Sequence, residues 1–119
     1  MDTLKISEEI QQKINQIAKG RSLLSSRAKK KSETIGAYYK KRAKVLIQLR
    51  NGVEFEIEGE KIVNPPATLC ENIARGICFQ EKIDQELAEA EYKNAVVGIQ
   101  ALQAELNGLQ SINRHLDET

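Results

Sequence analysis

The sequence has few aromatic residues and few prolines or cysteines. Aromatic residues make up 4% of the 119 residues, and tryptophan is absent. A compact core usually contains more large rings, so the core of this chain must be built from leucine, isoleucine, valine and alanine. That composition suits helices that pack against helices, and the length allows one domain.

Long apolar runs are absent as well. No run approaches the roughly 18 residues of a membrane-spanning helix, and no signal-peptide pattern opens the chain. Cys70 and Cys78 are expected about two turns apart on one helix, with Cα atoms roughly 12 Å apart, which is too far for a mutual disulfide. These features predict a reducing, cytoplasmic compartment.

Charge is balanced overall but divided along the chain. The net charge is +1, which favours neither nucleic acid nor a membrane as a partner. Residues 19–44 hold ten lysines or arginines and one acid, whereas residues 54–118 hold thirteen acids and five basic residues. A chain folded back at about residue 58 would bring residues 27–31 opposite residues 85–89, within the acidic stretch 81–91. The two arms are therefore predicted to attract each other.

A repeat of three and four residues predicts a helix over about residues 7–50. Its seam positions are Ile10, Ile14, Ile17, Arg21, Leu24, Ala28, Lys31, Ile35, Tyr38, Arg42, Val45 and Leu49. Nine of these twelve are apolar or aromatic, the pattern of a coiled-coil seam. Ser7 is expected to cap the start, and Asn51-Gly52 to end the helix. Gly20 and the serine-rich run at residues 22–26 leave open whether the helix breaks there.

A short extended linker is predicted over residues 53–64, where Val53, Phe55 and Ile57 alternate with glutamates. The second helix is predicted over about residues 65–116. Asn64 would cap it with Pro65 in the first turn, or Thr68 would open a capping box.

The second half of this helix carries an unbroken heptad, formed by Ala88, Tyr92, Ala95, Ile99, Leu102, Leu106 and Leu109. In its first half, Ile83 and Leu87 mark the apolar side, so we expect a change of phase between residues 83 and 88.

These patterns predict an all-α fold: one long antiparallel, coiled-coil-like helical hairpin with a short β-like linker, forming a single domain over residues 1–119. A two-helix hairpin leaves much of its apolar stripe exposed. We therefore expect self-association into a helical bundle, as a dimer or higher homo-oligomer.

The basic region at residues 27–44 is a candidate nucleic-acid or anion site, because lysine and arginine neutralise phosphates and tyrosine stacks on bases. The candidate residues are Arg21, Arg27, Lys29, Lys30, Lys31, Tyr38, Tyr39, Lys40, Lys41 and Arg42. Arg21, Lys31 and Arg42 occupy seam positions, where they would line an anion pocket between subunits or fix the helix register. The alternative, which we favour, is that the basic residues pair with the acidic second helix while the tyrosines pack in the seam.

Catalytic and metal motifs are missing. His115 lies far beyond Cys78 on the same helix, so the pair matches neither a zinc pattern nor a nucleophile-base arrangement. No paired acid and base is expected in a concave setting, so we predict no enzyme, cofactor or metal. Glu54, Glu56 and Glu58 form an acidic ladder that would either mimic phosphates or guard a strand edge. Phe55 and Phe79 are candidate partner-binding residues.

Two stretches carry a resemblance to known proteins. The first stretch comprises Ile47–Gly52, Glu58–Glu60 and Asn64–Thr68. The second is the tail, from Ala88–Lys93 through Leu106–Leu116. Over residues 38–116 the chain resembles small helical proteins of phages and prophages of Gram-positive bacteria. The resemblance implies an accessory role in the cytoplasm of an infected or lysogenic bacterium, supporting replication and recombination or interfering with a host factor or defence.

The function predicted is that of a non-enzymatic, oligomerising interaction module of phage type that binds a protein partner. One alternative is a nucleic-acid-binding accessory that uses residues 27–44. A further alternative is an anti-defence inhibitor or nucleotide sponge with an anion pocket between subunits.

Overall fold

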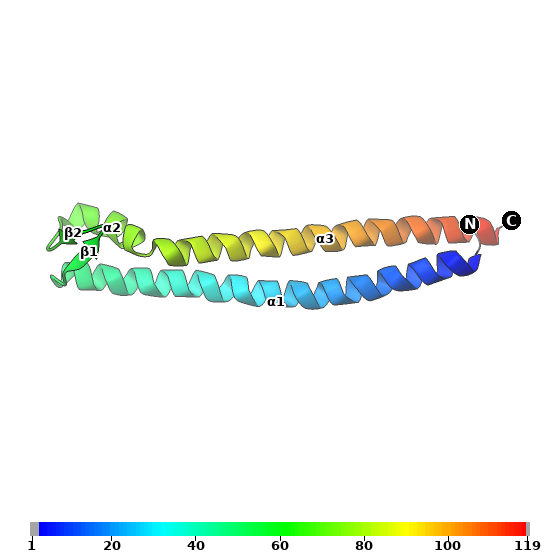
Figure 1. Cartoon of the computed structure of the whole chain (residues 1–119), viewed down its shortest axis with the longest axis horizontal. Helices are drawn as coiled ribbons and strands as arrows, with labels where there is room; N and C mark the ends of the chain where they lie inside the picture. Colours follow the sequence, from blue (N-terminus) through cyan, green and yellow to red (C-terminus); the bar gives the residue numbers. More distant parts are fainter. Residues whose placement is uncertain (1–2, 119) are drawn as a thin grey trace. The chain divides into compact units, whose positions relative to one another are not determined.

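The computed structural model describes residues 3–118 of the chain. Its elements are α1 (Thr3–Arg50), β1 (Phe55–Ile57), β2 (Glu60–Ile62), the 3-10 helix η1 (Ala67–Leu69), α2 (Cys70–Ile77) and α3 (Phe79–Asp117), as Figure 1 shows. Contacts divide the chain into unit 1, residues 1–29 with 90–119, and unit 2, residues 30–89. The predicted all-α fold with a β-like linker is confirmed, while the single domain over residues 1–119 stays a prediction.

Helix α1 is longer than its sequence pattern predicts. It is already helical at Thr3, so the predicted start at Ser7 is wrong, and it continues unbroken through residues 20–26. Its end matches the prediction at Asn51-Gly52, where Gly52 has a φ of 80°. The Val53 N–H donates to the Gln48 carbonyl at 3.0 Å and the Gly52 N–H to the Leu49 carbonyl at 3.2 Å. This Schellman pattern satisfies carbonyls that the helix end would leave unpaired.

The linker forms an antiparallel two-stranded hairpin in which Phe55 pairs with Ile62 and Ile57 with Glu60. Glu58 and Gly59 form the two-residue turn, with φ values of 50° and 84°. Positive φ at both turn residues matches the right-handed twist of the strands.

The second arm begins later than predicted and contains a break. Asn64 has a φ of 47°, which is not the conformation of a helix cap, and neither η1 nor α2 has a side-chain cap hydrogen bond. Both predicted caps, Asn64 and Thr68, are therefore wrong. At Cys78 the backbone leaves the helix, with φ −89° and ψ 23°, which separates α2 from α3.

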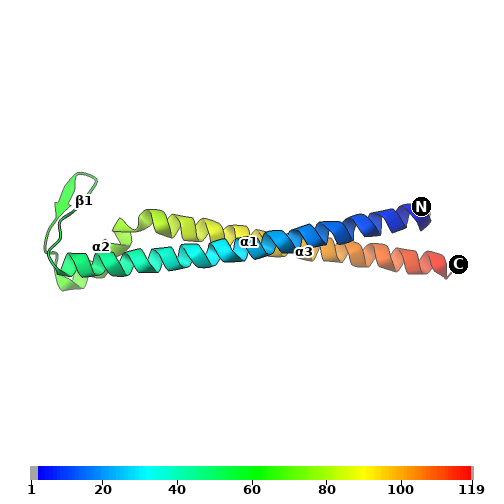
Figure 2. The ribbon, with the colours of Figure 1, turned by 90° about the horizontal axis from the view of Figure 1, so that it is seen from below.

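In unit 1 the first part of α1 and the last part of α3 lie side by side and antiparallel (Figures 1 and 2). Lys13 pairs with Glu105 at 2.5 Å and Arg27 with Glu91 at 2.9 Å. Between these pairs Gly20 lies against Ile99, so close that a Cβ at residue 20 would be 3.1 Å from the Ile99 Cγ1. The predicted charge attraction between the arms is confirmed, although Arg27 meets Glu91 and not residues 85–89.

Unit 2 contains the larger buried cluster, in which α1 packs on α2 and on Cys78, the residue between α2 and α3. Its buried members are Tyr38, Val45, Leu49, Cys70, Ala74 and Cys78. Phe55 and Ile62 of the hairpin pack against this cluster, so the linker covers part of the core of unit 2.

The face that α3 turns inward differs from the one its apolar residues suggest. Glu81 and Gln85 each have one buried side-chain oxygen, whereas Ile83 and Leu87 are exposed. The heptad that runs from Ala88 to Leu109 therefore continues toward the start of α3. Its alternating spacing of three and four residues passes through Gln85 and Glu81 to Cys78 without a change of phase. The stutter predicted between residues 83 and 88 is wrong.

Candidate interaction surfaces

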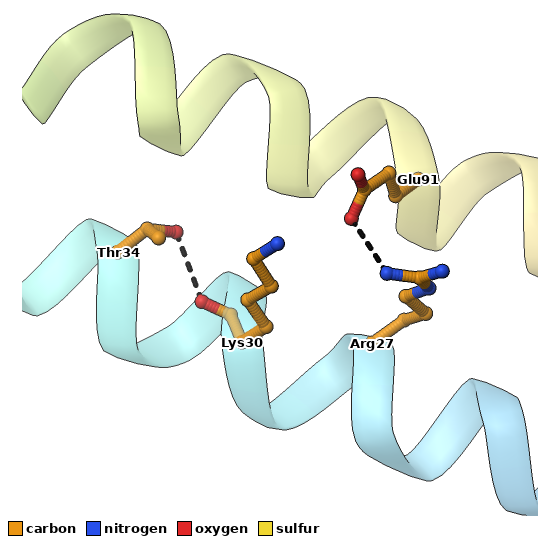
Figure 3. Close-up of polar contacts among 4 residues, drawn as sticks. All are labelled: Arg27, Lys30, Thr34 and Glu91. Carbon is orange, nitrogen blue, oxygen red and sulfur yellow. Dashed lines mark hydrogen bonds and ion pairs between the residues drawn. The ribbon is translucent and has the colours of Figure 1, made fainter. Parts of the chain in front are cut away.

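The basic residues of α1 that lie beside α3 are engaged in contacts within the chain. The Arg27 guanidinium donates to the Glu91 carboxylate, and Figure 3 shows the two side chains pointing toward each other. The Lys41 Nζ donates to the Glu81 Oε1 at 2.6 Å. This hydrogen bond lowers the pKa of Glu81 and raises the pKa of Lys41, because each charged form is stabilised by the other.

A tyrosine cluster brings together three of the predicted site residues. The rings of Tyr38 and Tyr39 meet edge to face, with centroids 5.4 Å apart. The Arg42 guanidinium lies 5.9 Å and 5.4 Å from these two ring centres, and the Lys82 Nζ lies 5.2 Å from that of Tyr38. Only 5% of Tyr38 is exposed, against 53% of Tyr39, so of these two rings that of Tyr39 is the one accessible to a base or a partner.

The remaining candidate cations do not converge on one pocket. Arg21 is exposed and lines a shallow groove with Ile17 and Leu106, whereas Lys31 and Arg42 are half-buried in unit 2. Lys29 and Lys30 are exposed. The carbonyl groups of Lys30 and Lys31 accept hydrogen bonds from the Thr34 hydroxyl, the first of which is drawn in Figure 3.

A cleft of about 680 Å³ lies in unit 2 beside α1. Its lining residues are Ala37, Lys40, Lys41, Lys44, Val45, Gln48, Phe55, Ile77 and Glu81. Phe55, Val45 and Ile77 give it an apolar lining, and three lysines stand along its α1 side. Phe55, predicted to contact a partner, is thus half-buried against the core and reaches solvent through this cleft.

An apolar stripe runs along the exposed side of α3 in unit 2. Phe79, Ile83 and Leu87 recur every four residues, with 62%, 44% and 59% of their surfaces exposed. Residues four apart lie on one side of a helix, so the three side chains form one row. Phe79 was singled out by the sequence, whereas Ile83 and Leu87 were assigned to the core. We call this row the α3 stripe.

The two cysteines are buried and free, and they belong to the core of unit 2. Burial raises the pKa of the Cys78 thiol. The Cys70 Sγ donates to the Pro66 carbonyl at 3.6 Å. Among residues 3–118, no group of three or more His, Cys, Asp or Glu side chains could hold a metal ion. No helix within these residues has the length and apolar content needed to cross a membrane.

Comparison with known proteins gives no assignment, since no family model, curated protein or solved structure matches the chain. The cleft and the α3 stripe are two surfaces of unit 2 that could bind a ligand.

Proposed function

We propose that the protein is a non-enzymatic helical interaction module that binds a protein partner along the α3 stripe. The observation that carries the proposal is the row of Phe79, Ile83 and Leu87, three large apolar side chains exposed on one side of one helix. Single exposed apolar residues are ordinary on protein surfaces, but contiguous ones mark binding sites. A helix presenting anchors at four-residue spacing is a common mode of recognition between proteins.

The balance between buried and exposed residues also supports a binding role. Among the described residues, ten hydrophobic residues are buried while thirteen large hydrophobic residues are exposed. The three side chains of the α3 stripe are 44% to 62% exposed, so completing their burial contributes roughly 2 to 5 kcal/mol, about half the value for fully exposed side chains. Association itself costs about 4 to 15 kcal/mol, so the stripe needs polar or further apolar contacts around it to hold a partner.

The biological setting in this proposal is the accessory role suggested by the resemblance to phage and prophage proteins. In that setting the module acts in the bacterial cytoplasm, and its target is a host factor, a defence component or another copy of the same chain.

Photo-crosslinking tests the proposal directly. A benzophenone amino acid at residue 79, in the full chain produced in a bacterial cell, should give one or two discrete covalent adducts after irradiation. The same amino acid at Lys93, an exposed position on α3 outside the stripe, is the matched control. Adducts to a second copy or to another protein both support the proposal. Equal or absent labelling from the two positions would contradict it.

A further inference from the structure

The cleft in unit 2 has the properties of a receptor for an acidic helix. Lys40 and Lys44 are exposed along its α1 side, and neither makes an ion pair within the described residues. Lys41, between them, is paired with Glu81, so one of the three lysine charges is already balanced. The cleft therefore keeps an excess of positive charge beside an apolar lining. A complementary ligand is a helix with large apolar side chains and acids next to them.

The chain itself carries such a helix face. The α3 stripe is interspersed with the exposed carboxylates of Asp84 and Glu86, which lie within the same two turns as Ile83 and Leu87. Asp84 accepts a hydrogen bond from Gln80, and neither acid forms an ion pair within residues 3–118. The outer side of α3 is thus an amphipathic surface with two acids beside the stripe; the one exposed lysine in the same turns, Lys82, has its Nζ 5.2 Å from the Tyr38 ring centre.

We propose that the partner of the α3 stripe is a second copy of this chain, whose Lys40–Lys44 cleft receives the stripe. This inference rests on the proposed function and names the partner. In a two-fold dimer each protomer offers its stripe to the other's cleft, so the same contact is made twice. Two stripes would bury six large side chains, so the favourable burial is doubled while the association cost is met only once.

The dimensions of the two surfaces agree. The stripe runs over nine residues from Phe79 to Leu87, and the eight steps between them span about 12 Å of helix at about 1.5 Å per residue. The α1 side of the cleft runs from Ala37 to Gln48, about 16 Å on the same basis. The lysine side can therefore accommodate the whole stripe, with Asp84 and Glu86 within the length that Lys40 and Lys44 span. The net charge of +1 opposes the approach of two copies only weakly.

The experiment is a charge exchange read out by sedimentation equilibrium of the full chain. The wild-type protein should sediment as a dimer. The variant Lys40→Glu/Lys44→Glu should dissociate at least about tenfold more readily, because four glutamates then face the acids of the stripe. Adding Asp84→Lys/Glu86→Lys to that variant should restore the dimer, since the signs are then exchanged and matched. The Lys41–Glu81 pair stays intact in all of these variants.

Two controls separate association from folding. Lys19→Glu/Lys93→Glu changes two exposed lysines outside the cleft and should leave the dimer unchanged. Far-ultraviolet circular dichroism should show equal helix content in every variant. A charge-exchanged protein that stays dissociated, or a lysine variant that dimerises as the wild type does, would overturn the inference.

A monomeric wild-type chain would overturn it as well. The proposed function is judged separately by the crosslinks from residue 79. An adduct to a different protein, together with a monomeric chain, would refute the self-docking inference while supporting the interaction module.

Discussion

At the scale of single residues, the pair of Lys41 and Glu81 links the two arms of unit 2. The lysine Nζ lies 2.6 Å from the Glu81 Oε1, while the Glu81 Oε2 is buried and has no hydrogen-bond partner among the described residues. A carboxylate at a seam position costs solvation that this one ion pair offsets only in part. The pair fixes which residues of the two helices face each other, as polar seam residues do in coiled coils.

The same pair predicts a dependence of stability on pH. The hydrogen bond from Lys41 lowers the pKa of Glu81 in the folded chain, so protonation favours the unfolded state. The contribution of the Lys41–Glu81 pair to the unfolding free energy is therefore present at neutral pH and is lost as the pH falls through the lowered pKa of Glu81. Because the pair is partly exposed, it amounts to no more than about 1 kcal/mol.

The check is urea unfolding of the wild type and Glu81→Gln between pH 7 and pH 3. The difference in unfolding free energy between them should shrink toward acid pH. Glu86→Gln, at an exposed carboxylate outside this pair, serves as the control. A difference that stays constant or grows as the pH falls would contradict the role assigned to the pair.

At the scale of the elements, two glycines of α1 occupy opposite environments. Gly36 is exposed, and a Cβ there would meet no atom within 4 Å. Gly20 faces Ile99, whose Cγ1 would be 3.1 Å from such a Cβ. The first glycine only weakens the helix, whereas the second allows close approach of α3.

We expect Gly36→Ala to raise the free energy of unfolding by about 0.8 to 1 kcal/mol, the usual helix-propensity gain. Gly20→Ala brings the same propensity gain but forces its new methyl group against Ile99, so its net gain should be smaller or negative. Thermal and urea unfolding of the two single variants measure the difference. A Gly20→Ala variant as stable as Gly36→Ala would show that the contact at Ile99 is looser than described.

The sequence predicts some elements well because the signals are local. Gly52 ends α1 with the positive φ that glycine tolerates, and the alternation at Val53, Phe55 and Ile57 marks the linker strand. The heptad from Ala88 to Leu109 indicates the inward side of α3. The start of α1 is missed because Ser7, a good cap by type, lies inside the helix. The break at Cys78 is missed because no proline or glycine stands at that residue.

The stripe was missed for a different reason. Ile83 and Leu87 are apolar and so were assigned to the core, while Glu81 was placed only in the acidic stretch expected to attract the first arm and Gln85 was given no role. In the structure Ile83 and Leu87 are exposed instead, because the repeat leading back from Ala88 places residues 81 and 85 inward and Lys41 supplies an ion pair for Glu81. Hydrophobic pattern alone cannot distinguish a core face from a binding face on the same helix.

At the scale of the whole molecule, the candidate cations serve mainly within the chain. Arg27 and Lys41 pair with acids of α3, and Arg42 lies over the two tyrosine rings. Lys40 and Lys44 remain available for a partner, beside the apolar lining of the cleft. Because the available lysines stand beside an apolar surface while other cations are engaged within the chain, we favour an acidic helix over a nucleic-acid backbone as the ligand of the basic region.

The α3 stripe, and every role given to it, exists only if α3 turns Glu81 and Gln85 toward α1. Urea unfolding of Gln85→Leu, at the same protein concentration as the wild type, tests this most directly. The buried Gln85 Oε1 has no hydrogen-bond partner within the described residues, so a leucine there should raise the unfolding free energy by about 1 to 2 kcal/mol. An unchanged or lower value would mean that residue 85 faces solvent and that Ile83 and Leu87 belong to the core.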